Sequence, residues 1–239
     1  MKVPLAEHFH SLQGEGYWVG TPMHFLRLPG CSVGRTVTSG DVIEVDRIDE
    51  LSQQPVLSTG KRAWLCRTWG GHPFWCDTDF GKYQEVELSD LLSETWEQHI
   101  CITGGEPLIH KEVLSAIEQA VFLSNTIKGL HIETSGTILR RKDSWKVWIT
   151  CSPKVGYLPD VVRTADELKL LIHSDSPDSF PAEAYSHPRV YLSPINGVGA
   201  HQYLDSGLSL ESFNRCRELL RSHPTWRLSV QLHKYLGLP

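Results

Sequence analysis

Hydrophobic positions along the chain follow two alternating patterns, one typical of buried strands and one typical of helices. Short apolar runs predict strands over residues 24–28, 99–103, 130–133, 147–150, 168–172, 190–192 and 226–230. Apolar side chains recur at helical spacing over residues 113–121 and 210–220, and a further helix is expected after Ser89, a plausible N-cap. This alternation predicts an α/β fold with a parallel sheet, and the length favours an incomplete (β/α) barrel over eight full repeats.

Composition and charge narrow the functional class. The 239 residues are 40% hydrophobic and carry a net charge of −5. The basic residues are scattered and do not cluster as in a surface that binds nucleic acid. We find neither the apolar run of a signal peptide nor a window that could span a membrane. The sequence therefore predicts one soluble, cytoplasmic domain over residues 1–239 that acts on a small molecule, with six reduced cysteines rather than disulfides.

Most candidate motifs come directly after a predicted strand. Cys31 follows the first strand, and Gly104-Gly105-Glu106-Pro107 follows the second. Three later strands are followed by Glu133-Thr134-Ser135-Gly136, Ser152-Pro153-Lys154 and Ser193-Pro194-Ile195-Asn196. Because the carboxyl ends of parallel strands form the reactive face of α/β folds, we expect these segments to converge.

Three cysteines lie in loops with glycine, tryptophan or aspartate neighbours, namely Cys31, Cys66 and Cys76. A [4Fe-4S] cluster normally has four thiolate ligands, so three thiolates leave one iron open to the amine and carboxylate of S-adenosylmethionine. Cys66, His72 and Cys76 also have a spacing that a small zinc site could use. The remaining cysteines are expected to serve packing, and these are Cys101, Cys151 and Cys216.

Seven ordered motifs resemble one enzyme family. They are Ser11-Leu12-Gln13-Gly14-Glu15-Gly16, Phe25-Leu26-Arg27-Leu28-Pro29-Gly30-Cys31, Trp75-Cys76-Asp77-Thr78-Asp79-Phe80, Thr103-Gly104-Gly105-Glu106-Pro107, Glu133-Thr134-Ser135-Gly136, Ser152-Pro153-Lys154 and Gln231-Leu232-His233-Lys234-Tyr235-Leu236-Gly237. Together they resemble the radical S-adenosylmethionine family of 7-carboxy-7-deazaguanine synthases, from about residue 5 to the end of the chain. The resemblance implies conversion of 6-carboxy-5,6,7,8-tetrahydropterin into 7-carboxy-7-deazaguanine with loss of ammonia, in queuosine and related deazapurine biosynthesis.

The resemblance also implies a role for individual residues, none of them a side-chain acid or base. Around S-adenosylmethionine it places Trp75, Ser152, Pro153, Lys154, Ser193, Pro194, Ile195 and Asn196. Residue chemistry adds Gly105 beside the methionyl group and Glu106 at its ammonium, and it leaves Glu133 either at the ribose hydroxyls or facing solvent. Around the pterin it places Leu12, Gln13, Gly14, Glu15, Arg27, Thr103 and the terminal carboxylate of Pro239. Thr78 matches the Mg²⁺ position, and Ser193 replaces the glutamine that is common in the family. An external one-electron reductant such as flavodoxin or ferredoxin, and a homodimer, are further expectations.

The spacing of the cysteines departs from the family pattern. Radical enzymes of this type usually carry all three cysteines in one short loop, whereas here Pro73 stands where the middle cysteine would be. We expect Cys66 to take that role, because loop closure costs rise only slowly with length. The cluster-binding loop would then contain an inserted segment at about residues 32–75, with a hairpin that turns at Gly70-Gly71.

Two other functional classes are compatible with part of this pattern. An activating enzyme for a glycyl-radical protein would share the cluster chemistry but would not need the Leu12-Gln13-Gly14-Glu15 segment. A non-catalytic, zinc-stapled binding protein would need the thiols but not Gly105, Glu106 or Lys154.

Overall fold

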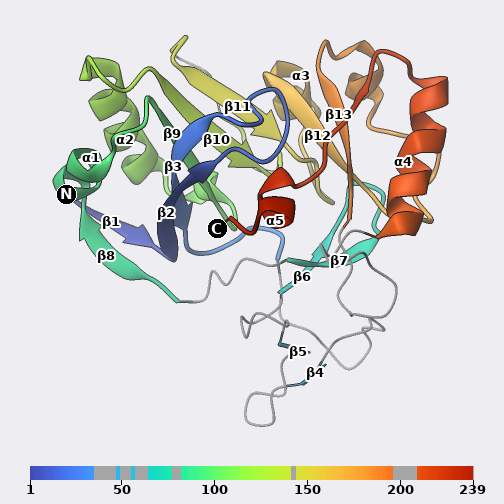
Figure 1. The fold of residues 1–239 in the computed structure, drawn as a ribbon, viewed down its shortest axis with the longest axis horizontal. Helices are drawn as coiled ribbons and strands as arrows, with labels where there is room; N and C mark the ends of the chain where they lie inside the picture. Colours follow the sequence, from blue (N-terminus) through green and yellow to red (C-terminus); the bar gives the residue numbers. More distant parts are fainter. Residues whose placement is uncertain are drawn as a thin grey trace.

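One large, mainly parallel sheet organises the computed structural model, which describes residues 1–34, 47–48, 55–56, 64–76, 82–140, 144–195 and 209–238 (Figure 1). The strand order in this sheet is β14-β13-β12-β11-β10-β9-β3-β2. The strands are β2 (Glu7–Leu12), β3 (Pro22–Leu28), β9 (His99–Gly104), β10 (Gly129–Thr134), β11 (Val147–Cys151), β12 (Glu167–Ile172), β13 (Val190–Pro194) and β14 (Arg227–Leu228). All neighbouring strands pair in parallel except β2 and β3, which are antiparallel.

Helices and short strand pairs complete the described part of the chain. The helices are α1 (Leu88–Glu94), α2 (Lys111–Leu123), α3 (Pro159–Thr164), α4 (Leu210–Ser222) and α5 (Leu232–Leu236), with 3-10 turns η1 (Pro107–Ile109) and η2 (Ala182–Ser186). The short antiparallel pairs are β1 (Lys2–Leu5) with β8 (Gln84–Glu87), β4 (Arg47–Ile48) with β5 (Pro55–Val56), and β6 (Trp64–Arg67) with β7 (Pro73–Cys76). No helix among the described residues is long and apolar enough to cross a membrane.

The two faces of the large sheet differ in chemistry because successive side chains of a strand point in opposite directions. One face is apolar and packs against the helices; α2 contributes Val113, Leu114, Ile117 and Val121 to this core. The other face carries a polar row across adjacent strands. Strand register places Arg27 opposite Thr103, Glu133 opposite Thr150, and Thr150 opposite Glu167.

The connection between β2 and β3, residues 13–21, makes hydrogen bonds to groups on the polar face. The Tyr17 N–H donates to Glu167 Oε2 at 2.8 Å, and the Gly16 N–H donates to Ser229 Oγ at 3.0 Å. Gly16 has a φ of +72°, and a Cβ at this position would lie 2.4 Å from Glu167 Oε1. The approach of this loop to the sheet therefore requires a glycine.

Most of the predicted elements are confirmed, with two corrections. The parallel strands and the helices α2 and α4 form where the pattern predicted them, and β6 and β7 form the expected hairpin, with Gly71 at a φ of +87°. The last strand is shorter than residues 226–230, because only two residues pair with β13. Ser89 is not an N-cap: α1 begins directly after β8, with Glu87 at the N-cap position and no side-chain cap.

Candidate active site

The glycine pair after β9 allows two loops to touch. A Cβ on Gly104 would lie 2.2 Å from the Leu28 carbonyl oxygen, and one on Gly105 would lie 1.9 Å from the Gly30 carbonyl oxygen. Neither contact leaves room for a side chain, and Gly104 also has a φ of +132°. The Glu106 N–H donates to that Gly30 oxygen at 3.1 Å, which fixes the neighbouring Cys31 beside Gly105.

Glu106 is fully buried, and protein groups bind both of its carboxylate oxygens. It accepts the Leu108 N–H at 3.1 Å and the Ser135 N–H at 2.8 Å. The hydroxyl groups of Thr134, at 2.9 and 3.0 Å, and of Ser135 also donate to it. An ammonium group could bind this carboxylate only by displacing one of these donors. In the structure, Glu106 joins the glycine loop to the carboxyl end of β10.

The loop that carries Cys31 is held by backbone and hydroxyl contacts. The Cys31 Sγ accepts the Gly34 N–H at 3.1 Å and the Val33 N–H at 3.5 Å. These two backbone contacts fix the position of the sulfur within the loop. Ser32 Oγ lies 2.8 Å from Thr137 Oγ1, which in turn lies 2.9 Å from Ser135 Oγ. This hydroxyl chain links the cysteine loop to the partners of Glu106.

The β6–β7 hairpin presents the other two cysteines on one face. Cys66 pairs with Phe74 and Trp64 pairs with Cys76, so all four side chains share a face. The Lys154 ammonium lies 5.5 Å from the centre of the Phe74 ring, and Thr68 forms a β-bridge with Lys154. The hairpin is thereby joined to the segment after β11.

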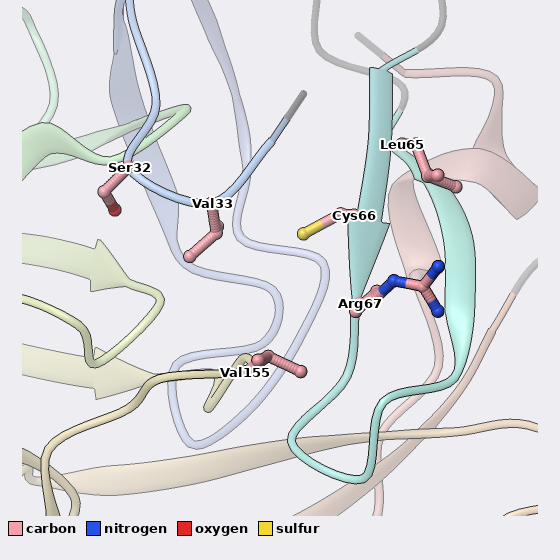
Figure 2. Close-up of a pocket in the computed structure, with 6 residues that line it drawn as sticks. All are labelled: Ser32, Val33, Leu65, Cys66, Arg67 and Val155. Atoms are coloured by element: carbon pink, nitrogen blue, oxygen red, sulfur yellow. The ribbon is translucent and has the colours of Figure 1, made fainter. Parts of the chain in front are cut away.

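A cavity of about 240 Å³ separates the hairpin from the Cys31 loop. It is lined by Ser32, Val33, Leu65, Cys66, Arg67 and Val155. Figure 2 shows the Cys66 sulfur directed across this cavity toward Val33, which is two residues from Cys31. Cysteines distant in sequence therefore come to the same side of the molecule.

Lys154 is a buried cation close to these thiols. Its Nζ donates to the Ser152 carbonyl oxygen at 2.8 Å and to Ser152 Oγ at 2.7 Å. Burial lowers the pKa of Lys154, whereas the thiolate of Cys66 would raise it. Burial likewise raises the pKa of the Cys66 thiol, and the Lys154 ammonium opposes that rise. A cation here would compensate the negative charge of cysteine ligands if they held a cluster.

A [4Fe-4S] cluster and a single zinc ion place different demands on the cysteines. Zinc requires its ligands to converge at about 2.0 to 2.3 Å from one point. Across the described residues, no group of three His, Cys, Asp or Glu side chains could hold one metal ion. The His72 ring instead stacks on His173, with 5.4 Å between ring centroids. A [4Fe-4S] cluster attaches each thiolate to a different iron, so its cysteines need not meet at one point.

A second group of predicted residues meets on the polar face of the sheet. Thr103 Oγ1 donates to Glu133 Oε2 at 3.3 Å, and Gln13 Nε2 donates to Glu133 Oε1 at 3.2 Å. Arg27 Nη1 lies 3.4 Å from Glu7 Oε2 on the neighbouring strand β2. Two of the residues assigned to the pterin, Gln13 and Thr103, thus contact Glu133, for which the sequence analysis considers the ribose of S-adenosylmethionine.

The Leu12-Gln13-Gly14-Glu15 segment also contacts the last helix. The Leu232 N–H donates to the Gly14 carbonyl oxygen at 3.1 Å, and a Cβ on Gly14 would lie 2.2 Å from His233 Nδ1. Glu15 is buried and accepts the Ser193 hydroxyl at 2.9 Å and the Lys169 ammonium at 2.8 Å. Ser193 therefore contacts Glu15, one of the residues assigned to the pterin.

The other predicted positions are buried, partly exposed or outside the described residues. Pro153 and Pro194 are buried, Leu12, Ser152 and Ile195 are partly exposed, and the Ile195 N–H donates to the Ile172 carbonyl oxygen at 2.9 Å. Cys76 is partly exposed. Thr78, Asn196, Pro239 and the side chain of Trp75 lie outside the described residues.

Sequence reasoning missed two charged residues of the polar face, Lys169 and Glu167. Both belong to β12, which the sequence showed only as an apolar strand. A lysine in the middle of a buried strand was the available signal, because charged residues are almost never fully buried unless paired. Period-two alternation would then have placed both residues on one face.

Comparison with known proteins gives a consistent result. No family model matches the chain. A 7-carboxy-7-deazaguanine synthase of Prochlorococcus marinus is 30% identical over 263 residues, covering 99% of this chain and 98% of the relative. One of a Synechocystis strain is 33% identical over 247 residues, covering 98% and 93%. The crystal structure of QueE from Escherichia coli matches with a TM-score of 0.57 and 25% identity, covering 98% of this chain and 95% of that chain.

Proposed function

The chain belongs to the 7-carboxy-7-deazaguanine synthase family, and from this premise we propose how its own residues perform the reaction. It is a radical S-adenosylmethionine lyase of queuosine biosynthesis. We propose that it converts 6-carboxy-5,6,7,8-tetrahydropterin into 7-carboxy-7-deazaguanine and ammonia. One observation carries the proposal. The Cys31 loop touches the Gly104-Gly105 turn, and Lys154 lies beside the hairpin face that presents Cys66 and Cys76.

The cofactors of such an enzyme are an iron-sulfur cluster and S-adenosylmethionine, which together supply an adenosyl radical. We propose that Cys31, Cys66 and Cys76 hold a [4Fe-4S] cluster. Lys154 would compensate the charge of the thiolates from its buried position. Gly105, Ser152, Pro153 and the run from Ser193 to Asn196, together with Trp75, are proposed to hold S-adenosylmethionine.

Glu106 has a positioning role in this proposal. Its carboxylate joins η1 to the carboxyl end of β10 through buried hydrogen bonds. These bonds fix the backbone after Gly105, the part of the loop that a methionyl group would approach.

The polar face of the sheet provides the substrate site in this proposal. The guanidinium of Arg27 would bind the pterin carboxylate through paired hydrogen bonds. Gln13, Thr103 and Glu133 would bind the amide and amine edges of the pterin. Thr78 is proposed to bind Mg²⁺ together with substrate oxygens and waters, since one neutral hydroxyl is a poor sole ligand. The pterin contact of the Pro239 carboxylate also remains part of the proposal.

We also propose the finer architecture and partners. The large sheet would curve into an incomplete (β/α) barrel of the radical S-adenosylmethionine type, in one domain with an inserted segment at about residues 32–75. β14 and β2, at opposite ends of the strand order, support an open barrel. Radical generation needs one electron, for which flavodoxin or ferredoxin is the proposed donor, and a homodimer is the proposed assembly.

Anaerobic reconstitution with iron and sulfide tests the proposal. The protein should become brown, bind about four irons and, with S-adenosylmethionine and dithionite, release 5′-deoxyadenosine. A colourless protein that binds stoichiometric zinc and leaves S-adenosylmethionine intact would contradict it.

A further inference from the structure

Lys169 occupies the centre of the polar face. It lies in the middle of β12, and its side chain is only 11% exposed. Its Nζ lies 2.8 Å from Glu15 Oε2 and 3.9 Å from Glu133 Oε2. The lysine is therefore shared between a carboxylate of the loop that follows β2 and a carboxylate of the sheet.

These contacts close a ring through Gln13. The Glu15 N–H donates to Gln13 Oε1 at 3.2 Å, which leaves Gln13 Nε2 to donate to Glu133 Oε1 at 3.2 Å. The Lys169 ammonium then bridges Glu133 and Glu15. The ring defines the orientation of the Gln13 amide and the distance between the two carboxylates. Its members come from three places in the sequence, so only the fold assembles it.

The charges of the ring depend on the lysine. Burial alone would raise the pKa of Glu15, but the Lys169 ammonium and the hydrogen bonds from Lys169 and Ser193 hold this pKa below its usual value. Burial would lower the pKa of Lys169, yet the carboxylates around it raise that pKa. Among the described residues, the charged or titratable groups that act on Lys169 or Glu15 are Cys101, Glu133, Lys154, Glu167 and His233. Without Lys169, the buried Glu15 carboxylate would lose its nearest cation, and the partly exposed Glu133 would lose a neighbouring one.

We propose that Lys169 is a positioning residue that keeps Glu15 ionised and holds the Glu15 and Glu133 carboxylates aligned to accept the N–H donors of an aminopyrimidine edge. This inference rests on the proposed function, because it assigns the polar face to the pterin. Charge-assisted hydrogen bonds to ionised carboxylates are stronger than bonds to neutral ones. A ligand rich in N–H groups therefore binds this face tightly only while Lys169 maintains the charge of Glu15.

The test uses the anaerobically reconstituted holoenzyme and the variant Lys169→Met, which keeps the length of the side chain and removes its charge. The dissociation constant for 6-carboxytetrahydropterin should rise about tenfold or more, whereas 5′-deoxyadenosine formation without pterin should stay within about twofold.

The acidic limb of the kcat/KM profile should move to higher pH, because the Glu15 carboxyl loses its neighbouring cation. Lys169→Arg should return that limb toward its original position. A surface control, Lys128→Met, should change none of these quantities, since Lys128 is exposed and its Nζ donates to the Asn125 carbonyl oxygen.

The double variant Lys169→Met with Glu15→Gln decides the outcome if the single variant does not fold. Removal of both charges leaves no uncompensated carboxylate at position 15, so the double variant should bind pterin about as well as Glu15→Gln alone. If the losses of pterin affinity in the two single variants simply added up in the double variant, the proposal would be overturned. A wild-type affinity and pH profile in Lys169→Met would also overturn it. Equal loss of cluster, deoxyadenosine formation and pterin binding would also overturn it, because Lys169 would then serve the whole fold. Absence of turnover in the wild-type holoenzyme would instead contradict the proposed function.

Discussion

Replacement of Glu106 by alanine separates a positioning role from direct contact with S-adenosylmethionine. The substitution removes the acceptor of two buried backbone N–H groups, those of Leu108 and Ser135. The hydroxyl groups that also donate to Glu106 can rotate, and Ser135 Oγ already lies 2.9 Å from Thr137 Oγ1. The two N–H groups cannot rotate in this way, so they determine the cost.

The magnitude follows from those two donors. A buried donor left without a partner costs about 1 to 3 kcal/mol, which gives about 2 to 6 kcal/mol for the pair. Relief of the burial cost of the carboxylate itself places the expected loss near the lower end. For a chain of this length, 1 kcal/mol corresponds to about 2 to 4 °C in Tm, so we expect a decrease of about 4 °C or more.

Thermal unfolding of the cluster-free protein, without S-adenosylmethionine, measures this effect. Glu94→Ala, at an exposed position of α1, is the matched control and should change the free energy of unfolding by less than about 0.5 kcal/mol. An unchanged Tm in Glu106→Ala, together with lost S-adenosylmethionine cleavage, would refute the reasoning. The carboxylate would then serve the cofactor and not the loop.

Three further predictions follow from the site and the core. Replacing Cys31, Cys66 or Cys76 with alanine should lower bound iron and abolish deoxyadenosine formation, whereas Cys101→Ala and Cys216→Ala should retain both; an intact cluster in Cys66→Ala would contradict the ligand assignment. Arg27→Ala should keep slow cleavage of S-adenosylmethionine without pterin but lose about 1.5 to 3 kcal/mol of substrate affinity, measured as product against deoxyadenosine; loss of cleavage in a cluster-loaded variant would argue against it. Burial lowers the pKa of His24 from 6.5 to about 4, so the unfolded chain binds more protons in that range and stability should fall as pH decreases from 6.5 to 4; chemical denaturation across this range should show a weaker dependence in His24→Gln.

The parallel strands could be predicted because each is buried and therefore appears in the sequence as a short apolar run of its own. Strands β9 to β13 read as apolar runs in the sequence, and their carboxyl ends bring the predicted motifs together as expected. Strands β1 and β8 could not be found this way. They are short, one contains Pro4, and they form only because distant residues pair with each other, from Lys2 with Glu87 to Leu5 with Gln84.

The candidate site likewise contains residues that the sequence revealed and residues that it did not. Gly104 and Gly105 were recognisable as a motif, and the structure shows the physical reason in the close approach of the Leu28 and Gly30 carbonyl groups. Lys169 was hidden because a strand pattern indicates burial but not the partners of a buried charge. Those partners, Glu15 and Glu133, are set by the loop that follows β2 and by strand register.

The most direct test of the account is anaerobic turnover of 6-carboxy-5,6,7,8-tetrahydropterin by the reconstituted enzyme with S-adenosylmethionine and a reductant, with the product identified by mass. We predict 7-carboxy-7-deazaguanine together with one equivalent of ammonia. Cleavage of S-adenosylmethionine with the pterin recovered unchanged, in an enzyme with a full cluster, would contradict the assignment of the polar face to this substrate.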